Sequence, residues 1–325
     1  MRDIAMLGLT VTPTGEFQGA TTAAERESML ATCYRAADEG PGAILPQISP
    51  RPISACMGIE LPDSRNPFSR HPTFQALKEE GLGAQEIKER LKTPEAKAAL
   101  MEESAQGLGA RWFPEGAAEL RVLRGEPGEY EITDPAQFVA GQAEAAGLDV
   151  WEFAYEELVQ KESMFSKALT KNAAPDGNLD PIFHDLKRPI TRCALGDSGA
   201  HLTSLMDGGF FPWFLAHFCR DRTLGPTFSI EEAVKILTSD NAELYNLEDR
   251  GLLKVGLLAD INVIDGERIM PQPPCLKYDL PAGSGRLHQQ PIGIEATIKS
   301  GVVIMQHGEE TGEMPGKLLR GPQSV

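Results

Sequence analysis

The sequence predicts an α/β fold with a parallel sheet, followed by a small and mostly antiparallel β domain. At the start of the chain, an apolar run at 4–11, a helical pattern at 23–39 and a second apolar run at 43–49 follow one another. Strand, helix and strand in this order form a βαβ unit, whose two strands are parallel. Towards the end, short β runs at 259–265 and 296–304 lie between Pro- and Gly-rich loops, which is typical of antiparallel strands.

Length, composition and charge indicate a globular protein. A chain of 325 residues is long enough for one large domain and a smaller one. Its 41% hydrophobic and 24% charged residues are ordinary for a folded domain. The net charge of -16 argues against a nucleic-acid surface, because phosphate binding needs clustered Lys and Arg. No apolar run reaches the roughly 18 residues of a membrane-spanning helix, so we expect neither nucleic acid nor membrane as a partner.

The cysteines predict a reducing environment. There are five of them, scattered, without a CxxC or Cys/His spacing: Cys33, Cys56, Cys193, Cys219 and Cys275. This pattern predicts neither a disulfide framework nor a structural zinc site. We therefore expect a cytoplasmic protein.

The first functional candidate lies just after the second apolar run. Pro46 cannot donate to a strand ladder, so that strand is expected to be short or bulged. The chain then leaves the sheet through 49–52, and Arg51 is the fixed cation near this exit. Arg51 is suited to bind a substrate carboxylate through two hydrogen bonds, or to brace the loop by bonding backbone carbonyls, and both interpretations stay open.

The middle of the chain reads as an insertion. Residues 74–107 predict two helices with solvated charged faces, separated at Pro94. Residues 108–147 mix Gly, Pro and acidic side chains and predict an irregular segment, a candidate lid or oligomer contact.

Regular structure returns with a helix at about 150–162 and a strand at 164–169. Lys171 and Asn172 follow this strand, at the end where side chains of parallel sheets face a pocket. A plain polar loop is the alternative for both residues.

The stretch Gly196-Asp197-Ser198-Gly199-Ala200-His201 follows an apolar run at 190–195. A carboxylate placed where a buried strand ends lies at the edge at which α/β folds collect their catalytic groups. Asp197 is therefore the candidate catalytic residue. The alternative is an Asp that turns the chain by bonding nearby backbone N–H groups.

Two further helices follow. The aromatic pattern at 210–221, with Pro212 in its first turn, predicts a core helix, and His217 within it is expected to be a core histidine with its hydrogen bonds satisfied. Ser229 and Glu232 have the spacing of a capping box that opens the next helix.

The C-terminal residues carry a family resemblance. The string at 249–265, with its Gly, its Ala-Asp pair and its terminal Asp at set intervals, resembles the return from barrel to β-sandwich in the amidohydrolase superfamily. The segments 279–283, 308–312 and 315–321 look like the closing segments of the N-acyl-D-amino-acid deacylase (D-aminoacylase) branch, and 47–52 is similar to a segment near its middle. The resemblance covers nearly the whole chain.

The resemblance implies a fold and a division into domains. Family members have a metal-dependent (β/α)8 TIM-like barrel, of which this chain would contain about the last four strand–helix units. That partial barrel would occupy 1–247, with the helical and irregular insertion at about 74–147, and a β-sandwich portion would occupy 248–325.

The resemblance also implies a site. The last barrel strand of the family ends in an Asp followed by Gly-Gly-Ala-His, which Asp197-Ser198-Gly199-Ala200-His201 matches with Ser198 in place of the first Gly. Asp197 would then be a zinc ligand and the general base on the metal-activated water. Ser198 and His201, with Arg51 and Asn172, are the candidate substrate-binding residues.

One departure concerns the metal site. Family members begin with a His-x-His pair, which this sequence does not contain; its six histidines are His71, His184, His201, His217, His288 and His307. Catalytic zinc normally takes three protein ligands. We therefore expect a fragment, a degenerate remnant, or one half of a split enzyme whose partner carries the ligands. The expected partners are a small N-acyl amino acid and either an N-terminal half chain or further copies of this chain.

Three functions follow from these expectations. The leading one is hydrolysis of amide (non-peptide C–N) bonds, most like N-acyl-D-amino acid deacylation. The second is a non-catalytic or split-enzyme subunit that binds a partner chain. The third is a cyclic-amide hydrolase of the dihydroorotase or hydantoinase kind, against which the D-aminoacylase-like tail counts.

Overall fold

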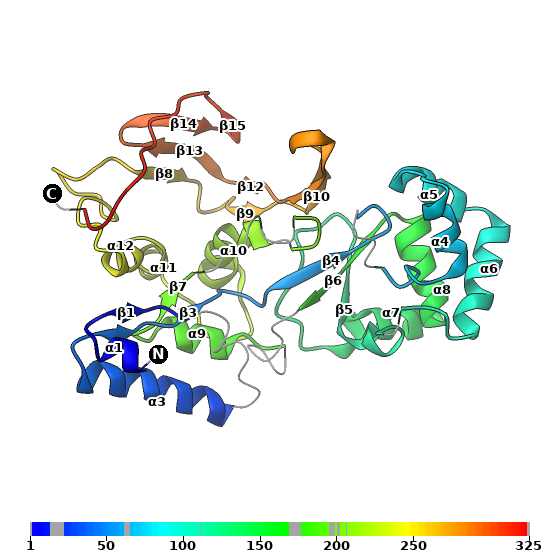
Figure 1. Cartoon of the computed structure of the whole chain (residues 1–325), viewed down its shortest axis with the longest axis horizontal. Coiled ribbons are helices and arrows are strands. Elements are labelled where there is room, and N and C mark those ends of the chain that lie inside the picture. Colours follow the sequence, from blue (N-terminus) through cyan, green and yellow to red (C-terminus); the bar gives the residue numbers. More distant parts are fainter. Residues whose placement is uncertain are drawn as a thin grey trace.

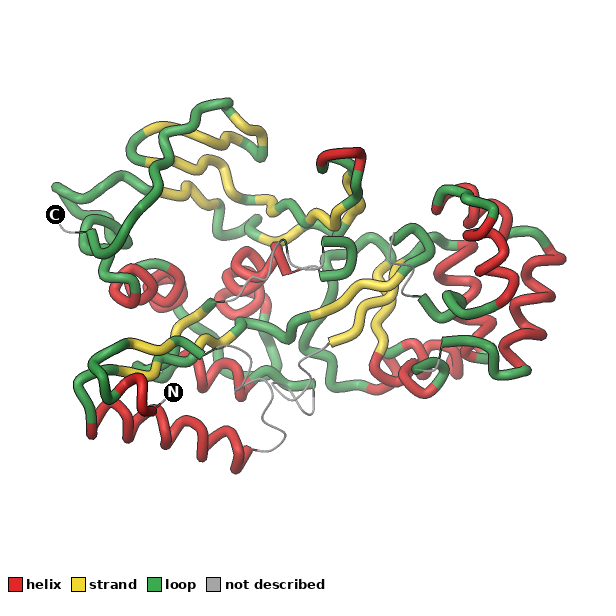
Figure 2. The backbone as a smooth tube through the Cα atoms, in the orientation of Figure 1, coloured by secondary structure: helices red, strands yellow, loops and turns green. Residues whose placement is uncertain are grey.

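The computed structural model describes residues 2–13, 23–61, 66–110, 112–168, 177–194, 199, 202–205 and 207–323. The fold is mixed α/β, as predicted (Figure 1). A first α/β unit contains the start of the chain, and a three-stranded sheet joins it to a group of helices (Figure 2). The C-terminal strands lie above the first unit in the view of Figure 2. Within the described ranges the sheets do not close into a barrel. None of the described helices is long and apolar enough to cross a membrane.

The first unit contains the predicted βαβ arrangement. Strand β1 (Thr10–Val11) pairs in parallel with β2 (Ala43–Ile44), and helix α3 (Ala23–Glu39) connects them. The second apolar run is interrupted at Pro46, as expected, so that β3 (Gln47–Ile48) pairs instead with β7 (Arg192–Cys193), again in parallel. The two short parallel pairs are separate sheets.

The prediction of one buried strand at 4–11 is wrong. Residues Arg2–Ala5 form helix α1, the chain turns at Gly8, and the Gly8 N–H donates to the Ala5 carbonyl at 2.9 Å. Met6, Leu7 and Leu9 are exposed. A short apolar run does not distinguish a helix from a strand, and here only its last two residues find a strand to pair with.

The second unit is a three-stranded antiparallel sheet in the order β4-β6-β5, with a group of helices beside it (Figure 2). Its strands are β4 (Ser54–Met57), β5 (Leu120–Leu123) and β6 (Met164–Ala168). Its helices are α4 (Pro72–Glu79), α5 (Ala84–Leu91), α6 (Pro94–Ala105), α7 (Val139–Ala146) and α8 (Val150–Tyr155), with short 3-10 turns at Glu115–Glu119 and Pro135–Gln137. These elements share an apolar core that includes Phe68, Phe74, Phe113, Trp151 and Phe165.

Two predictions for this region are corrected. Residues 74–107 hold three helices instead of two, because the chain breaks at Gly81–Gly83 as well as at Pro94. Residues 108–147 are not irregular throughout, since they contain β5 and α7. All four residues of β5 are buried, so their backbone N–H and C=O groups need hydrogen-bond partners inside the protein. The antiparallel pairing with β6 supplies these partners.

The remaining helices return to the first unit. They are α9 (Asp180–Leu186), α10 (Phe210–Ala216), α11 (Ile230–Leu237) and α12 (Ser239–Leu244), with a 3-10 turn at Asp207–Gly209; α8 and α10 continue as π-helical turns at Glu156–Gln160 and His217–Asp221. As predicted, α10 is a core helix, and Phe214 and Phe218 pack with Phe228. The ring of His217 stacks on Trp213 at 4.3 Å and its Nε2 lies 2.9 Å from a Glu131 carboxylate oxygen, so its interpretation as a satisfied core histidine is confirmed.

The C-terminal strands are antiparallel, as expected. A four-stranded sheet has the order β15-β14-β13-β8. The strand pairs β9 with β12 and β10 with β11 form two further small sheets. The strands are β8 (Ile261–Ile264), β9 (Met270–Pro271), β10 (Cys275–Lys277), β11 (Arg286–His288), β12 (Pro291–Ile292), β13 (Ile294–Lys299), β14 (Val302–Gln306) and β15 (Glu309–Glu310), with a 3-10 turn at Pro281–Gly283. Ser300 and Gly301 both have positive φ, at 51° and 82°, which is the turn that a two-residue hairpin favours.

The predicted capping box at the start of α11 is confirmed. The Glu232 N–H donates to Ser229 Oγ at 3.2 Å, and the Ser229 N–H donates to a Glu232 carboxylate oxygen at 3.1 Å. We expect Ser229→Ala to lower the free energy of unfolding by about 1 kcal/mol, because an N-terminal N–H of the helix loses its acceptor. Urea unfolding measures the change. Ser28→Ala, on the exposed face of α3, is the matched control, and equal effects of the two substitutions would contradict the prediction.

Candidate functional site

The sequence places the predicted catalytic stretch directly after β7. Asp197, Ser198 and His201 lie outside the described residues, as do Lys171 and Asn172, so their roles stay predictions. Gly199 is described and has a φ of 98°, a left-handed conformation that favours glycine. The surroundings of Gly199 therefore define the part of this site that can be built from the structure.

The segment 202–205 is held between two sheets. On one side the Cys56 N–H of β4 donates to the Ser204 carbonyl at 2.6 Å, and Leu205 forms an antiparallel bridge with Ala55. On the other side the Leu287 N–H of β11 donates to the Leu202 carbonyl at 2.7 Å. The chain that follows the predicted catalytic stretch is thus fastened to the three-stranded sheet and to the C-terminal hairpin.

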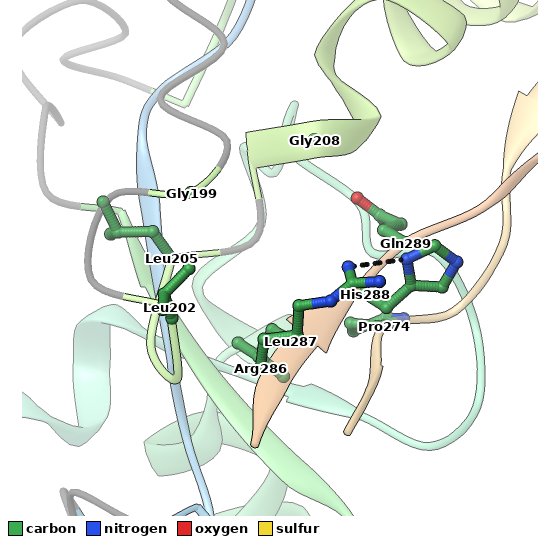
Figure 3. A pocket seen from close by; sticks show the side chains of 9 residues that line it. All are labelled: Gly199, Leu202, Leu205, Gly208, Pro274, Arg286, Leu287, His288 and Gln289. Atoms are coloured by element: carbon green, nitrogen blue, oxygen red, sulfur yellow. Dashed lines mark hydrogen bonds between the residues drawn. The ribbon is translucent and has the colours of Figure 1, made fainter. Parts of the chain in front are cut away.

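A pocket of about 340 Å³ lies where this segment meets the hairpin (Figure 3). Its two walls come from distant parts of the sequence: Gly199, Leu202, Leu205 and Gly208 on one side, and Pro274, Arg286, Leu287, His288 and Gln289 on the other. The first wall is apolar. Among the described lining residues, the polar side chains all belong to the second wall.

Arg286 is the charged group of the polar wall. Its Nε and Nη2 each donate to a carboxylate oxygen of Asp279 at 2.7 Å, and its Nη1 donates to His288 Nδ1 at 3.1 Å (Figure 3). A guanidinium carries no lone pair to accept with, so Nδ1 of His288 is the acceptor and the neutral ring carries its proton on Nε2.

His288 is held neutral by its surroundings. Burial lowers the pKa of His288, and the positive charges of Lys277 and Arg286 lower it further, while contact with Gln290 and the charge of Asp279 act in the opposite direction. Nε2 of His288 makes no hydrogen bond of good geometry within the described residues. Gln289 is 92% buried, since 8% of its surface is exposed; its amide donates to the Pro127 carbonyl at 3.3 Å and its Oε1 has no hydrogen-bond partner in the same ranges.

Arg51 lies in the core. It is 1% exposed, and its Nη1 donates to the Pro52 carbonyl and to an Asp207 carboxylate oxygen, both at 3.2 Å. The guanidinium also lies between the rings of Tyr130 and Phe210, at 3.9 and 4.1 Å from their centres. The bond to Pro52 is the contact that the loop-bracing interpretation expects. A role in binding substrate carboxylate stays a prediction.

Arg121 is a polar core residue that the sequence interpretation missed. The register of the sheet places Arg121 opposite Ser166, which in turn lies opposite Cys56. Arg121 is 7% exposed, and its guanidinium lies 5.4 Å from the Tyr130 ring centre. Within the described part of the chain its Nε and Nη1 have no hydrogen-bond partner. Burial lowers the pKa of Arg121 and raises that of Tyr130 to about 12. A lone Arg inside the apolar run 120–123 is the sequence signal that could have identified this position.

The described residues do not build a metal site. No group of three or more His, Cys, Asp or Glu side chains among them is placed to hold a metal ion. Burial raises the pKa of both Cys56 and Cys193 to about 12, so these thiols stay protonated and are poor ligands. Zinc therefore does not fit this part of the chain, and no chemical step is assigned to it here.

Comparison with known proteins identifies the family. The sequence model described as the amidohydrolase family matches residues 134–305, more than half of the chain. The chain belongs to the amidohydrolase family. The match includes Asp197 and every residue that lines the pocket. Members of the family typically depend on a metal ion.

A solved structure gives a distant likeness. It is N-acyl-D-glutamate deacylase from Bordetella bronchiseptica in complex with zinc and a phosphonate inhibitor, 16% identical to this amidohydrolase, with a TM-score of 0.39. The match covers 86% of this chain and 43% of that one, so this chain spans less than half the length of the deacylase. A search of curated proteins found no match.

Proposed function

We propose that this amidohydrolase hydrolyses the amide bond of N-acyl amino acids, most like N-acyl-D-amino acids. The observation that carries the proposal is the family match over 134–305, which includes Asp197 and the residues that line the pocket beside Gly199. The resemblance of the closing segments to the D-aminoacylase branch supports the choice of substrate over a cyclic amide.

The parallel pairing of β3 with β7 supports the assignment of roles. Because these strands run in the same direction, the chain leaves both of them at the same edge of the sheet. In the sequence, Arg51 follows β3 and Asp197 follows β7. In the proposed reaction Asp197 accepts a proton from the hydrolytic water and passes it to the leaving amine. Arg51, Asn172, Ser198 and His201 are the proposed substrate-binding residues.

The proposal includes a larger assembly. We propose that the chain supplies about the last four strand–helix units of a (β/α)8 barrel, and that the metal ligands come from an N-terminal half chain or another partner.

Asp197→Asn is expected to reduce amide hydrolysis by at least about 10²-fold, because the amide side chain cannot accept the proton. The measurement is release of free amino acid from N-acetyl-D-amino acids, by the chain reconstituted with an N-terminal half chain and zinc. Asp221→Asn, at an exposed aspartate after α10, is the matched control and should keep full activity.

The substrate panel separates the three functions. Release of D-amino acids supports the proposal, and hydrolysis of dihydroorotate or a hydantoin alone would replace it with the cyclic-amide alternative. A chain that binds its partner chain, while the assembly with zinc hydrolyses neither class, would be a non-catalytic subunit. Full activity of Asp197→Asn would overturn the assignment of the general base.

A further inference from the structure

A fully buried histidine lies inside the helical group, which consists of α4 to α8. His71 is the N-cap residue of α4 and is 0% exposed. Its ring packs against the rings of Phe68 and Trp151, with distances of 5.4 and 5.2 Å between ring centres, and Phe113 packs on Trp151 at 4.6 Å. A Cβ atom at Gly109 would lie 2.0 Å from Trp151 and 3.0 Å from His71, so the close approach of the chain to these two rings requires glycine.

The hydrogen bonds of His71 fit the neutral ring. Nε2 lies 2.9 Å from Ser104 Oγ on α6, and this hydroxyl donates its proton to the Leu100 carbonyl at 2.8 Å. The hydroxyl therefore accepts from His71, so Nε2 carries the proton of the neutral ring. Nδ1 is buried and makes no hydrogen bond of good geometry within the described residues. A second proton on the ring would lie at Nδ1, out of contact with water.

The charges around the ring compensate little for a second proton. Of the charged groups that the structure describes, Glu103 of α6 is the one that acts on His71. Its carboxylate is already bonded to Thr73, whose N–H and hydroxyl donate at 3.0 and 2.7 Å. The segment before α4 and helix α8 present the uncharged rings of Phe68 and Trp151 instead. A charge buried without a partner costs free energy, so the packed helical group favours the neutral ring.

This preference makes the packing of the helices depend on pH. Burial lowers the pKa of His71 below its ordinary value of 6.5, and the charge of Glu103 and the Phe68 carbonyl, which raise the pKa, do not outweigh burial. In an opened helical group the ring is exposed to water and takes up its proton near the ordinary value. The stability that the neutral ring contributes is therefore full above about 6.5 and is lost as the pH falls further.

We propose that His71 is an acid-sensitive latch: its neutral ring holds α4, α6 and α8 together, and protonation of the ring opens the helical group. The latch lies in the unit that fastens the chain after the predicted catalytic stretch, because the core that contains Trp151 also contains Met57 of β4. The N–H of Cys56 on the same strand donates to the Ser204 carbonyl. The inference goes beyond the proposed function and does not depend on it.

Hydrogen exchange of the full chain, at about pH 7.5 and about pH 5 and corrected for intrinsic exchange rates, tests the latch. At about pH 5 an exposed histidine is protonated in roughly 30-fold excess over the neutral form. We therefore expect opening to increase by about threefold to about 30-fold at the lower pH, in peptides that cover α4 and α6. His184→Gln, at an exposed histidine of α9, is the matched control and should show the acid response of the unaltered chain.

His71→Gln and His71→Phe remove the titrating group in two different ways. Gln retains a donor for Ser104 Oγ, and Phe retains an aromatic ring in contact with Phe68 and Trp151. In both variants we expect opening at about pH 5 to stay within about twofold of opening at about pH 7.5.

Two results would overturn the inference. One is equal protection of the unaltered chain at both pH values. The other is an acid response of unchanged size in both variants, even where they are less protected at each pH, since that is what a merely structural role of His71 predicts. Should neither variant fold, the ring resonances of His71 in the unaltered chain decide: titration over the pH range in which the helices open supports the latch, and titration outside that range contradicts it.

Discussion

Arg51→Met is expected to lower the free energy of unfolding by about 3–5 kcal/mol, because it leaves the buried carboxylate of Asp207 without its counter-ion. Both side chains of the pair are at most 1% exposed, so water does not replace the lost partner. The stacking of the guanidinium between Tyr130 and Phe210 is lost as well. Urea unfolding at neutral pH measures the change.

Arg121→Met is the matched control for this prediction. Arg121 is also buried beside Tyr130, but among the described residues its Nε and Nη1 have no hydrogen-bond partner, so removing its charge relieves a desolvation cost. We expect Arg121→Met to change the free energy of unfolding by less than about 1 kcal/mol or to raise it. The double variant Arg51→Met with Asp207→Asn should recover part of the loss. Equal effects of Arg51→Met and Arg121→Met would show that the ion pair with Asp207 does not set the cost.

Glu131→Gln is expected to cost on the order of 3 kcal/mol at neutral pH, because it removes the charge that faces a buried arginine. Nε and Nη2 of Arg222 donate to the two carboxylate oxygens of Glu131 at 2.9 and 2.7 Å, and the Leu179 N–H donates at 2.8 Å. Glu131 thereby ties the segment after β5 to the helices α9 and α10.

The same carboxylate predicts a pH dependence. Burial by itself raises the pKa of Glu131, but the hydrogen bonds from Arg222, His217 and the Leu179 N–H outweigh it and lower the pKa to about 2. The unfolded chain therefore takes up this proton first as the pH falls, and the stability that Glu131 contributes is full above about 4.5 and is lost between about 4.5 and about 2. Unfolding free energies measured across this window should fall less steeply in Glu131→Gln.

Glu144→Gln, at an exposed position of α7, is the control for both measurements and should match the unaltered chain. A Glu131→Gln variant with the same stability and the same acid profile as this control would contradict the prediction.

Elements with local signals could be predicted from the sequence. Helix α3 has its predicted bounds, the capping box at Ser229 opens α11, and the hairpin turns at Ser300 and Gly301. In each case the deciding interaction joins residues a few positions apart, so the pattern that predicts it lies within one short window.

Elements that depend on a distant partner could not be predicted. Strand β5 (Leu120–Leu123) exists because it pairs with β6 (Met164–Ala168), which lies far along the chain. The burial of Arg121 follows from that pairing. In the same way, only Thr10 and Val11 of the run at 4–11 form a strand, because β2 pairs with these two residues. Periodicity describes which faces a segment presents and does not say which segment will cover them.

For the candidate site too, some features follow from the sequence and others only from contacts between distant segments. The sequence by itself determined the family resemblance, the position of Asp197 after a short strand and the family match that includes it. Only the tertiary structure decided that Arg51 pairs with Asp207 in the core, and that the hairpin with Arg286, His288 and Gln289 meets Gly199 to form a pocket. The physical reason is that these contacts are hydrogen bonds and packing between segments far apart in the chain, which form only when the whole fold brings their polar groups out of water together.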